Sequence, residues 1–299
     1  MAYIIENANI LKDNQLLRRS LLIKENRIAS IQTEVKQYKW MKMNAESYIM
    51  TPAFVLLNNK IPYKGTFQEI KKYMTEQFLL KGCTAILTFV NVSYEKDILD
   101  KMREMKTSLM GSPVDFIIGV KIPLKLVTQS FIRICKRERI PAIFVEINKA
   151  DDLEKVPWGW IRDAIFPFNN PLIPIISSID KKESKDILSK WKIIMVKEKI
   201  PCLLEELPEN EPLSACVLNK IGLYPQKASL MHGAEVSYNL YLKDREIKNV
   251  DEVNLFHYHG NRLVVTIHKG KVVRSGGDVF YRPGNGEYVK VKTPSYFTI

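Results

Sequence analysis

Short apolar runs separated by turns occupy both ends of the chain and predict β-structure there. Near the start they lie at 3–5, 20–24, 28–32 and 47–50, with a turn at Asn26. After about residue 228 they return at 237–241, 252–258, 263–267 and 271–273. Because a strand needs partners to bury its apolar face, we expect the two terminal segments to meet and form one β-sandwich.

The middle of the chain alternates apolar runs with amphipathic stretches, a pattern that predicts a parallel sheet with crossover helices. The candidate strands are 53–57, 85–90, 116–122, 142–147, 172–176 and 201–204. A helix is predicted to begin after Thr66, because Glu69 completes a capping box, and Gly82 is placed to end it. The pattern divides the chain into a first sandwich part (1–51), a barrel-like α/β domain (52–227) and a second sandwich part (228–299).

Four stretches together point to a known scaffold. They are SLLIKENRIASI with the following YIMTPAFVLLNNK, then KGCTAILTFV, VLNKIGLYPQKASLMHGAEVSYNLY and NRLVVTIHKGKVVRSGG. In this order they resemble the amidohydrolase superfamily, which includes dihydroorotases, allantoinases, adenine deaminases and N-acetylglucosamine-6-phosphate deacetylases. The resemblance implies an α/β fold with a TIM-like (β/α) barrel and a β-sandwich from both termini, and hydrolysis of C–N bonds by a metal-activated water. Residues 52–222 are fewer than the roughly 250 of a whole TIM barrel, so we expect a shortened or distorted barrel.

The resemblance also implies two metal-binding histidines after the first barrel strand, but Asn58 and Lys60 occupy those positions. A lysine ammonium has no lone pair for a metal, and an asparagine carbonyl is a weak ligand for zinc. All four histidines come after residue 231, and Glu146 is the one analogue of a later family ligand. We therefore predict no metal site, no cofactor and a chain that has lost the family's hydrolytic chemistry.

Polar side chains stand at or near the predicted carboxyl ends of the barrel strands, the rim where this architecture builds its sites. We expect Lys60 and Glu146 to form an ion pair in place of a metal, or to bind a small polar or anionic ligand. If catalysis remains, Lys60, Glu146 and Glu205 are the candidate acids and bases. The predicted ligand-binding residues are Asn58, Lys60, Lys121, Glu146 and Ser177.

Two further residue types have ordinary structural explanations. His257 and His259 show HxH spacing, which we interpret as alternating polar positions of an exposed strand or turn. The cysteines lack CxxC spacing and sit in apolar surroundings, which is typical of buried reduced thiols. They are Cys83, Cys135, Cys202 and Cys216.

Charge and composition change this picture little. Lys and Arg outnumber Asp and Glu by 45 to 33, a formal net charge of +12, but acidic residues are interspersed and no nucleic-acid-binding motif accompanies the charge. Nucleic-acid binding is therefore disfavoured. The absence of a signal-peptide or membrane-span pattern predicts a cytoplasmic protein without membrane contact, and many relatives associate, so a homodimer is expected.

Three functions follow from these observations. The leading hypothesis is an amidohydrolase-like protein without catalysis that serves as a ligand-binding or regulatory scaffold. The second is a metal-independent hydrolase that acts on C–N bonds with the lysine and glutamate residues of the barrel mouth. The third is a basic interaction protein that binds an acidic partner or nucleic acid.

Overall fold

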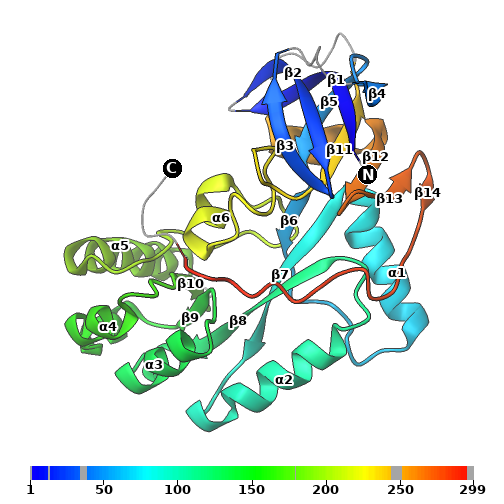
Figure 1. Ribbon diagram of the computed structural model, residues 1–299. Coiled ribbons are helices and arrows are strands. Elements are labelled where there is room, and N and C mark those ends of the chain that lie inside the picture. The colour runs from blue at the N-terminus through cyan, green and yellow to red at the C-terminus, as the bar shows by residue number, and fades with distance from the viewer. Residues whose placement is uncertain (1, 13, 34–38, 179, 244–250, 295–299) are drawn as a thin grey trace.

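A computed structural model describes residues 2–12, 14–33, 39–178, 180–243 and 251–294 and contains two separate sheets (Figure 1). One is a curled parallel sheet of five strands from the middle of the chain. The other is a mixed sheet of nine strands from both ends. The predicted fold class is confirmed, with the barrel only half formed.

The parallel sheet has the strand order β10-β9-β8-β7-β6, so strands that follow one another along the chain are neighbours in space. Parallel neighbours need crossover connections, and helices supply them. All the carboxyl ends therefore meet at one edge of the sheet, which we call the mouth. The strands are β6 (Phe54–Leu57), β7 (Cys83–Asn91), β8 (Asp115–Pro123), β9 (Ile143–Ile147) and β10 (Leu172–Ile176).

Four crossover helices and a fifth helix, which follows the last strand, cover one face of this sheet and build the largest core. The predicted capping box is confirmed, because the Thr66 side chain accepts from the backbone of Glu69 and the Glu69 carboxylate accepts from the backbone of Thr66. Among the described residues, no helix is both long and apolar enough to cross a bilayer. The helices are α1 (Phe67–Gln77), α2 (Ile98–Ser108), α3 (Gln129–Arg137), α4 (Trp158–Ile165) and α5 (Lys181–Glu198).

The other, concave face of the sheet packs against segments that follow β10 in the chain. Alternation along the strands points Val55, Leu87 and Phe144 to this side, where they join a second core with Leu218 of α6 (Ala215–Ile221). The prediction of a full strand at 201–204 is wrong. The segment is reduced to one bridge between Cys202 and Leu172, because the chain leaves the sheet directly afterwards.

A late segment, residues 285–291, runs across the parallel sheet (Figure 1, red) and pairs with the start of β8. We call it the strap. Tyr288 bridges to Phe116 of β8, and Val291 enters the concave core. Gly286 lies so close to β8 that a β-carbon there would be 1.9 Å from the carbonyl oxygen of Val114, so only glycine fits.

The mixed sheet joins both ends of the chain, as expected, in the order β14-β13-β12-β11-β5-β1-β2-β3 with β4 paired to β1. A register shift between Ile5 and Ala8 bends β1, so its first half pairs with β4 and its second half with β5. The strands are β1 (Ala2–Lys12), β2 (Gln15–Lys24), β3 (Arg27–Gln32), β4 (Met41–Asn44), β5 (Tyr48–Pro52), β11 (Tyr238–Leu242), β12 (Leu263–His268), β13 (Lys271–Ser275) and β14 (Asp278–Val279).

The strand predicted at 252–258 is wrong, because this segment forms the helix α7 (Glu252–Tyr258). Asp251 begins the helix, and its side chain accepts from the backbone N–H of Asn254. His257 lies in the last turn and His259 just beyond it. Their HxH spacing therefore comes from a helix end and not from an exposed strand.

Candidate functional site

Three of the predicted residues meet at the concave side of the mouth. The side chains of Lys121 and Glu146 face the concave side near the carboxyl ends of β8 and β9, and Ser177 follows β10. The Lys121 ammonium lies 2.7 Å from Glu146 Oε1, and Ser177 Oγ donates to the same oxygen at 3.0 Å. The side chains of Lys121 and Glu146 are 22% and 32% exposed, so solvent can reach the pair.

The Glu146 carboxylate is held in its charged form. The hydrogen bond from Lys121 lowers the pKa of Glu146 below its ordinary value, and the bond from Ser177 acts in the same direction. Partial burial opposes this but does not reverse it. Glu146 is therefore an acceptor with a tethered cation beside it, and it is poorly suited to act as a general acid.

Asn58 does not join this group. It continues the row of β6 that faces the helices, and its side chain is fully buried. Its amide Nδ2 donates to the hydroxyl of Tyr73 at 2.9 Å, and Oδ1 accepts from the backbone of Lys60 at 3.0 Å. The hydrogen-bonding capacity of Asn58 is used within the protein, which gives it the role of a structural anchor for the chain after β6.

Lys60 and Glu205 lie apart from the mouth pair. The predicted ion pair between Lys60 and Glu146 is wrong, because Lys60 pairs with Glu209 at 2.8 Å and Glu146 with Lys121. Lys60 is 71% exposed, and the hydrogen bond to Glu209 raises its pKa, which keeps it protonated and unsuited to act as a base. Glu205 makes an exposed pair with Lys192 at 3.0 Å.

The mouth is a poor fit for the metal that the family resemblance implies. Among the described strand ends, one carboxylate, Glu146, faces the concave side and no imidazole does. Zinc in proteins takes three or four nitrogen, sulfur or carboxylate ligands. The ammonium of Lys121 already neutralises Glu146 at contact distance, so a divalent ion would have to displace it.

A cavity of about 780 Å³ opens beside Glu146, between β9 and the chain around α3 and α4. Lys125 and Lys155 line it, as does Trp160, whose ring is largely exposed. Lys155 pairs with Asp152 at 2.7 Å, whereas Lys125 has no acidic partner among the described residues. The cavity therefore offers one unpaired cation and an aromatic surface.

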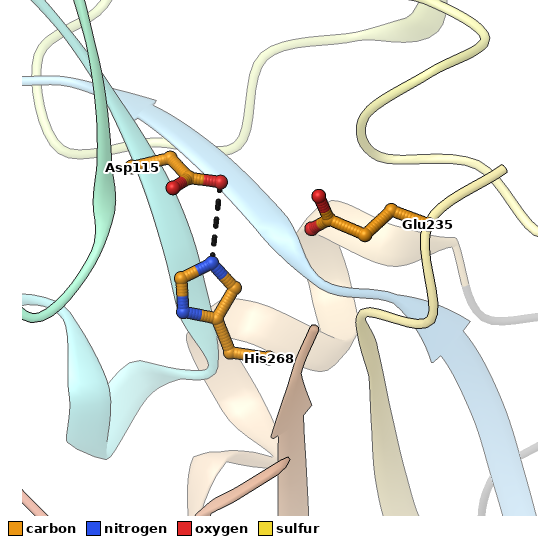
Figure 2. A group of neighbouring side chains, drawn as sticks. All are labelled: Asp115, Glu235 and His268. Atoms are coloured by element: carbon orange, nitrogen blue, oxygen red, sulfur yellow. Dashed lines mark hydrogen bonds and ion pairs between the residues drawn. The ribbon is translucent and has the colours of Figure 1, made fainter. Parts of the chain in front are cut away.

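A second cluster of donor groups lies at the opposite edge of the sheet, where β8 begins. Asp115, Glu235 and His268 place one ligand atom each within 4.8 Å of one another (Figure 2). His268 Nε2 contacts Asp115 Oδ2 at 3.2 Å, and Asn285 donates to His268 Nδ1 at 3.1 Å. Because Nδ1 accepts, the ring proton is assigned to Nε2, and the imidazole donates to the carboxylate.

The ammonium groups of two lysines already form ion pairs with the carboxylates of this cluster. Lys227 Nζ lies 2.5 Å from Asp115 Oδ2 and also contacts the carboxylate of Glu235, and Lys269 Nζ is 2.8 Å from Asp115 Oδ1. Burial alone would raise the pKa of Asp115, but His268 and Lys227 together hold it well below its ordinary value. The three donors suit a metal by type, yet Lys227 stands between the carboxylates, and the predicted absence of any metal site stays a prediction.

The sequence interpretation overlooked this buried cluster. Asp115 does give a signal in the sequence, because it is a single charged residue at the start of the apolar run DFIIGV. Its partners lie 112 and 153 residues away and show no local signal. The cysteines agree better with their prediction: all are free, three are buried, and burial raises the pKa of Cys202 to about 11.

Comparison with known proteins gives similarity in structure but not in sequence. No protein-family model and no curated protein matches the chain. A D-hydantoinase matches over all of both chains with a TM-score of 0.58 and 12% identity. A dihydropyrimidinase from Brevibacillus agri NCHU1002 matches over 99% of this chain and 100% of its own, with a TM-score of 0.63 and 12% identity.

A D-hydantoinase from Bacillus sp. AR9 matches over 98% of this chain and 100% of its own, with a TM-score of 0.62 and 10% identity. At such low identity the likeness is one of backbone arrangement. It agrees with the half-barrel and the mixed sheet of the two ends, in the order that the sequence resemblance implied. The chain has the backbone fold of these D-hydantoinases and of the dihydropyrimidinase.

Proposed function

We propose that this chain is a binding protein on an amidohydrolase scaffold, without metal-dependent hydrolysis, whose mouth takes a small polar or anionic ligand. The observation that carries the proposal is the Lys121–Glu146–Ser177 group, in which a lysine supplies the positive charge beside the carboxylate of Glu146. The neighbouring cavity of about 780 Å³ is within the size range of small-molecule sites.

The two carboxylates in the wall of this cavity, Glu146 and Asp152, are already paired with Lys121 and Lys155, which leaves Lys125 as the cation for an anionic ligand. Lys125 has no acidic partner among the described residues. The N-terminus of α3, which carries a partial positive charge from the peptide dipoles, lies in the same wall. Trp160 provides a flat apolar surface on which a planar ligand can stack. Hydrolysis without a metal has no comparable support, because Lys60 is exposed and protonated and Glu146 is paired.

Metal content tests the first half of this proposal. The full chain, produced with zinc and manganese in excess and then passed through a chelating column, should retain no stoichiometric metal and hydrolyse no member of a cyclic-amide panel. Elemental analysis of Glu146→Gln and Asp115→Asn locates any retained ion. A stoichiometric ion that disappears only in Glu146→Gln, together with turnover of a cyclic amide, would contradict the proposal.

Ligand binding tests the second half. Inorganic phosphate and small dicarboxylates, titrated against the full chain, should shift the NMR signals of Lys125 and of the Trp160 indole in a saturable way. Lys125→Gln should weaken this binding roughly tenfold, since a charge-assisted hydrogen bond is lost. Lys185→Gln makes the same change on the exposed surface of α5 and serves as the control. Equal effects of the two variants would remove the support for this cavity.

The ion pair between Lys121 and Glu146 can be tested separately. Replacing Lys121 by methionine should raise the pKa of Glu146 toward its ordinary value, because the hydrogen bond that lowers it most is gone. A carbon-detected NMR titration of the glutamate carboxyl groups measures this pKa. Lys149→Met, a change at an exposed lysine just after β9, should leave it where it is. A Glu146 pKa that stays low in Lys121→Met would show that the two groups do not pair.

A further inference from the structure

A second cavity, of about 430 Å³, lies between the mixed sheet and α6, at the amino end of β6. This is the edge of the half-barrel opposite the mouth, so the two cavities are separate. Its wall is mostly apolar, with contributions from the mixed sheet, from β6 and from α6. Representative lining residues are Ile10, Leu17, Ile31, Phe54, Leu218 and Tyr224.

Two cations stand in this apolar wall. The register of the hairpin β1–β2 pairs Ile10 with Leu17, and alternation places Lys12 and Arg19 on the same face as these two. All four side chains line the cavity. The hairpin therefore presents two apolar side chains and two basic ones to one half-open cavity.

These cations are not neutralised within the described protein. The hydrogen bond that Arg19 donates goes to the backbone carbonyl of Arg18 at 3.1 Å, and neither Lys12 nor Arg19 has an acidic partner among the described residues. Glu252 is the one carboxylate among the described residues of the wall, and it has an interaction partner of its own. A charged group beside an apolar cavity gains most from a ligand that brings the opposite charge into that space.

His232 adds a third polar group to the wall. Its Nδ1 donates to the carbonyl oxygen of Ala29 at 2.8 Å, because a carbonyl can only accept. That bond fixes the ring and leaves Nε2 for another partner. Apolar walls with a few placed polar groups are the usual composition of small-molecule sites.

We propose that this cavity binds a small molecule with an apolar body and a carboxylate group. The body occupies the space between β6, α6 and the hairpin, and the carboxylate lies at Arg19 and Lys12. This site is independent of the mouth, so it stands whether or not the mouth binds an anion.

Straight-chain carboxylates test the proposal by isothermal titration calorimetry on the full chain. Hexanoate, octanoate and decanoate should bind with an affinity that rises roughly fourfold per methylene group until the cavity is full, and then levels off. Octanol and octylamine, which have the same body without the negative charge, should bind at least about ten times more weakly than octanoate.

Variants place the binding in this cavity. Arg19→Gln should weaken octanoate binding roughly tenfold, and Leu17→Trp, which fills the space from the rim, should abolish it. Arg18→Gln is the matched control, because Arg18 is the next residue on β2, points to the other face and pairs with Glu46 at 2.9 Å. Lys12→Gln repeats the charge test at an exposed position, in case Arg19→Gln fails to fold.

Three results would overturn the proposal. One is the absence of saturable binding for all three acids. Another is equal binding of octanol and octanoate, together with equal effects of Arg19→Gln and Arg18→Gln. The last is octanoate binding that survives in Leu17→Trp, because the acid would then occupy another place.

Discussion

Replacing Asp115 by asparagine should lower the free energy of unfolding by about 3–5 kcal/mol. The side chain is 1% exposed, and its carboxylate pairs with Lys227, Lys269 and His268 at the same time. Removing its charge leaves Lys227 with Glu235 alone and Lys269 with the exposed Glu287, in a site that water hardly reaches, and that penalty is larger than the loss of one hydrogen bond. Urea denaturation followed by circular dichroism measures the change.

Asp100→Asn is the control for this variant. Asp100 pairs with Arg103 at 3.3 Å on the exposed surface of α2, where an ion pair contributes less than about 1 kcal/mol. If the two variants lost similar stability, the buried network would not hold the fold together. Asp115 Oδ1 also accepts from the backbone N–H of Glu287 in the strap at 2.8 Å, a bond that the amide oxygen of asparagine can keep, so the strap should stay attached in the variant.

The same carboxylate makes stability depend on pH. Its pKa is lower in the folded protein than the value of about 3.9 expected for an unfolded chain. The folded state therefore binds fewer protons, and the contribution of Asp115 is fully present above about pH 4 and is lost as the pH falls toward the folded pKa. The stability difference between the natural chain and Asp115→Asn should be constant near neutral pH and shrink in acid; a difference that grew in acid would contradict the assignment.

Trp191→Ala should lower the free energy of unfolding by a similar amount, about 3–5 kcal/mol. Trp191 lies on α5, is fully buried and packs edge-on against Trp158, with ring centroids 6.0 Å apart. Its indole N–H donates to the carbonyl of Leu203 at 2.8 Å. The truncation therefore opens a cavity and also releases the segment that stands where a sixth barrel strand would be.

Ile193→Ala on the same helix is the matched control, since Ile193 is 65% exposed. It should change the free energy of unfolding by less than about 0.5 kcal/mol in the same urea titration. Equal losses in both variants would mean that the burial of Trp191 does not determine the result, because alanine raises the helix propensity at both positions.

How much of the fold could be predicted depended on how local the signal was. The apolar runs of the parallel sheet and the capping box at Thr66 are read within a few residues, and both are confirmed. The helix α7 is hard to predict because its polar and apolar residues also fit a strand, and the N-cap Asp251 is the local signal that distinguishes the two. At 201–204 the apolar run is real, but tertiary packing and not the run decides that it makes one bridge.

The candidate site was less predictable for the same reason. Strand ends placed Lys121, Glu146 and Ser177 at one edge, because parallel strands share that edge. In a strand that is buried on both faces, both sets of alternating side chains are apolar. The sequence therefore does not show which set faces the concave side, and Asn58 cannot be assigned to the helix side from it. The choice of ion-pair partner depends on loop geometry, and Glu209, which takes Lys60, lies 149 positions later in the chain.

The strap also has a consequence for the time at which this protein folds. It pairs with β8 across 172 positions of sequence, and residue 291 is needed to complete the concave core. A ribosome releases the five parallel strands long before it reaches this segment. We therefore expect the half-barrel to remain partly open during translation, with its inner side accessible to water and to chaperones, and to close in a slow step governed by long-range contact formation.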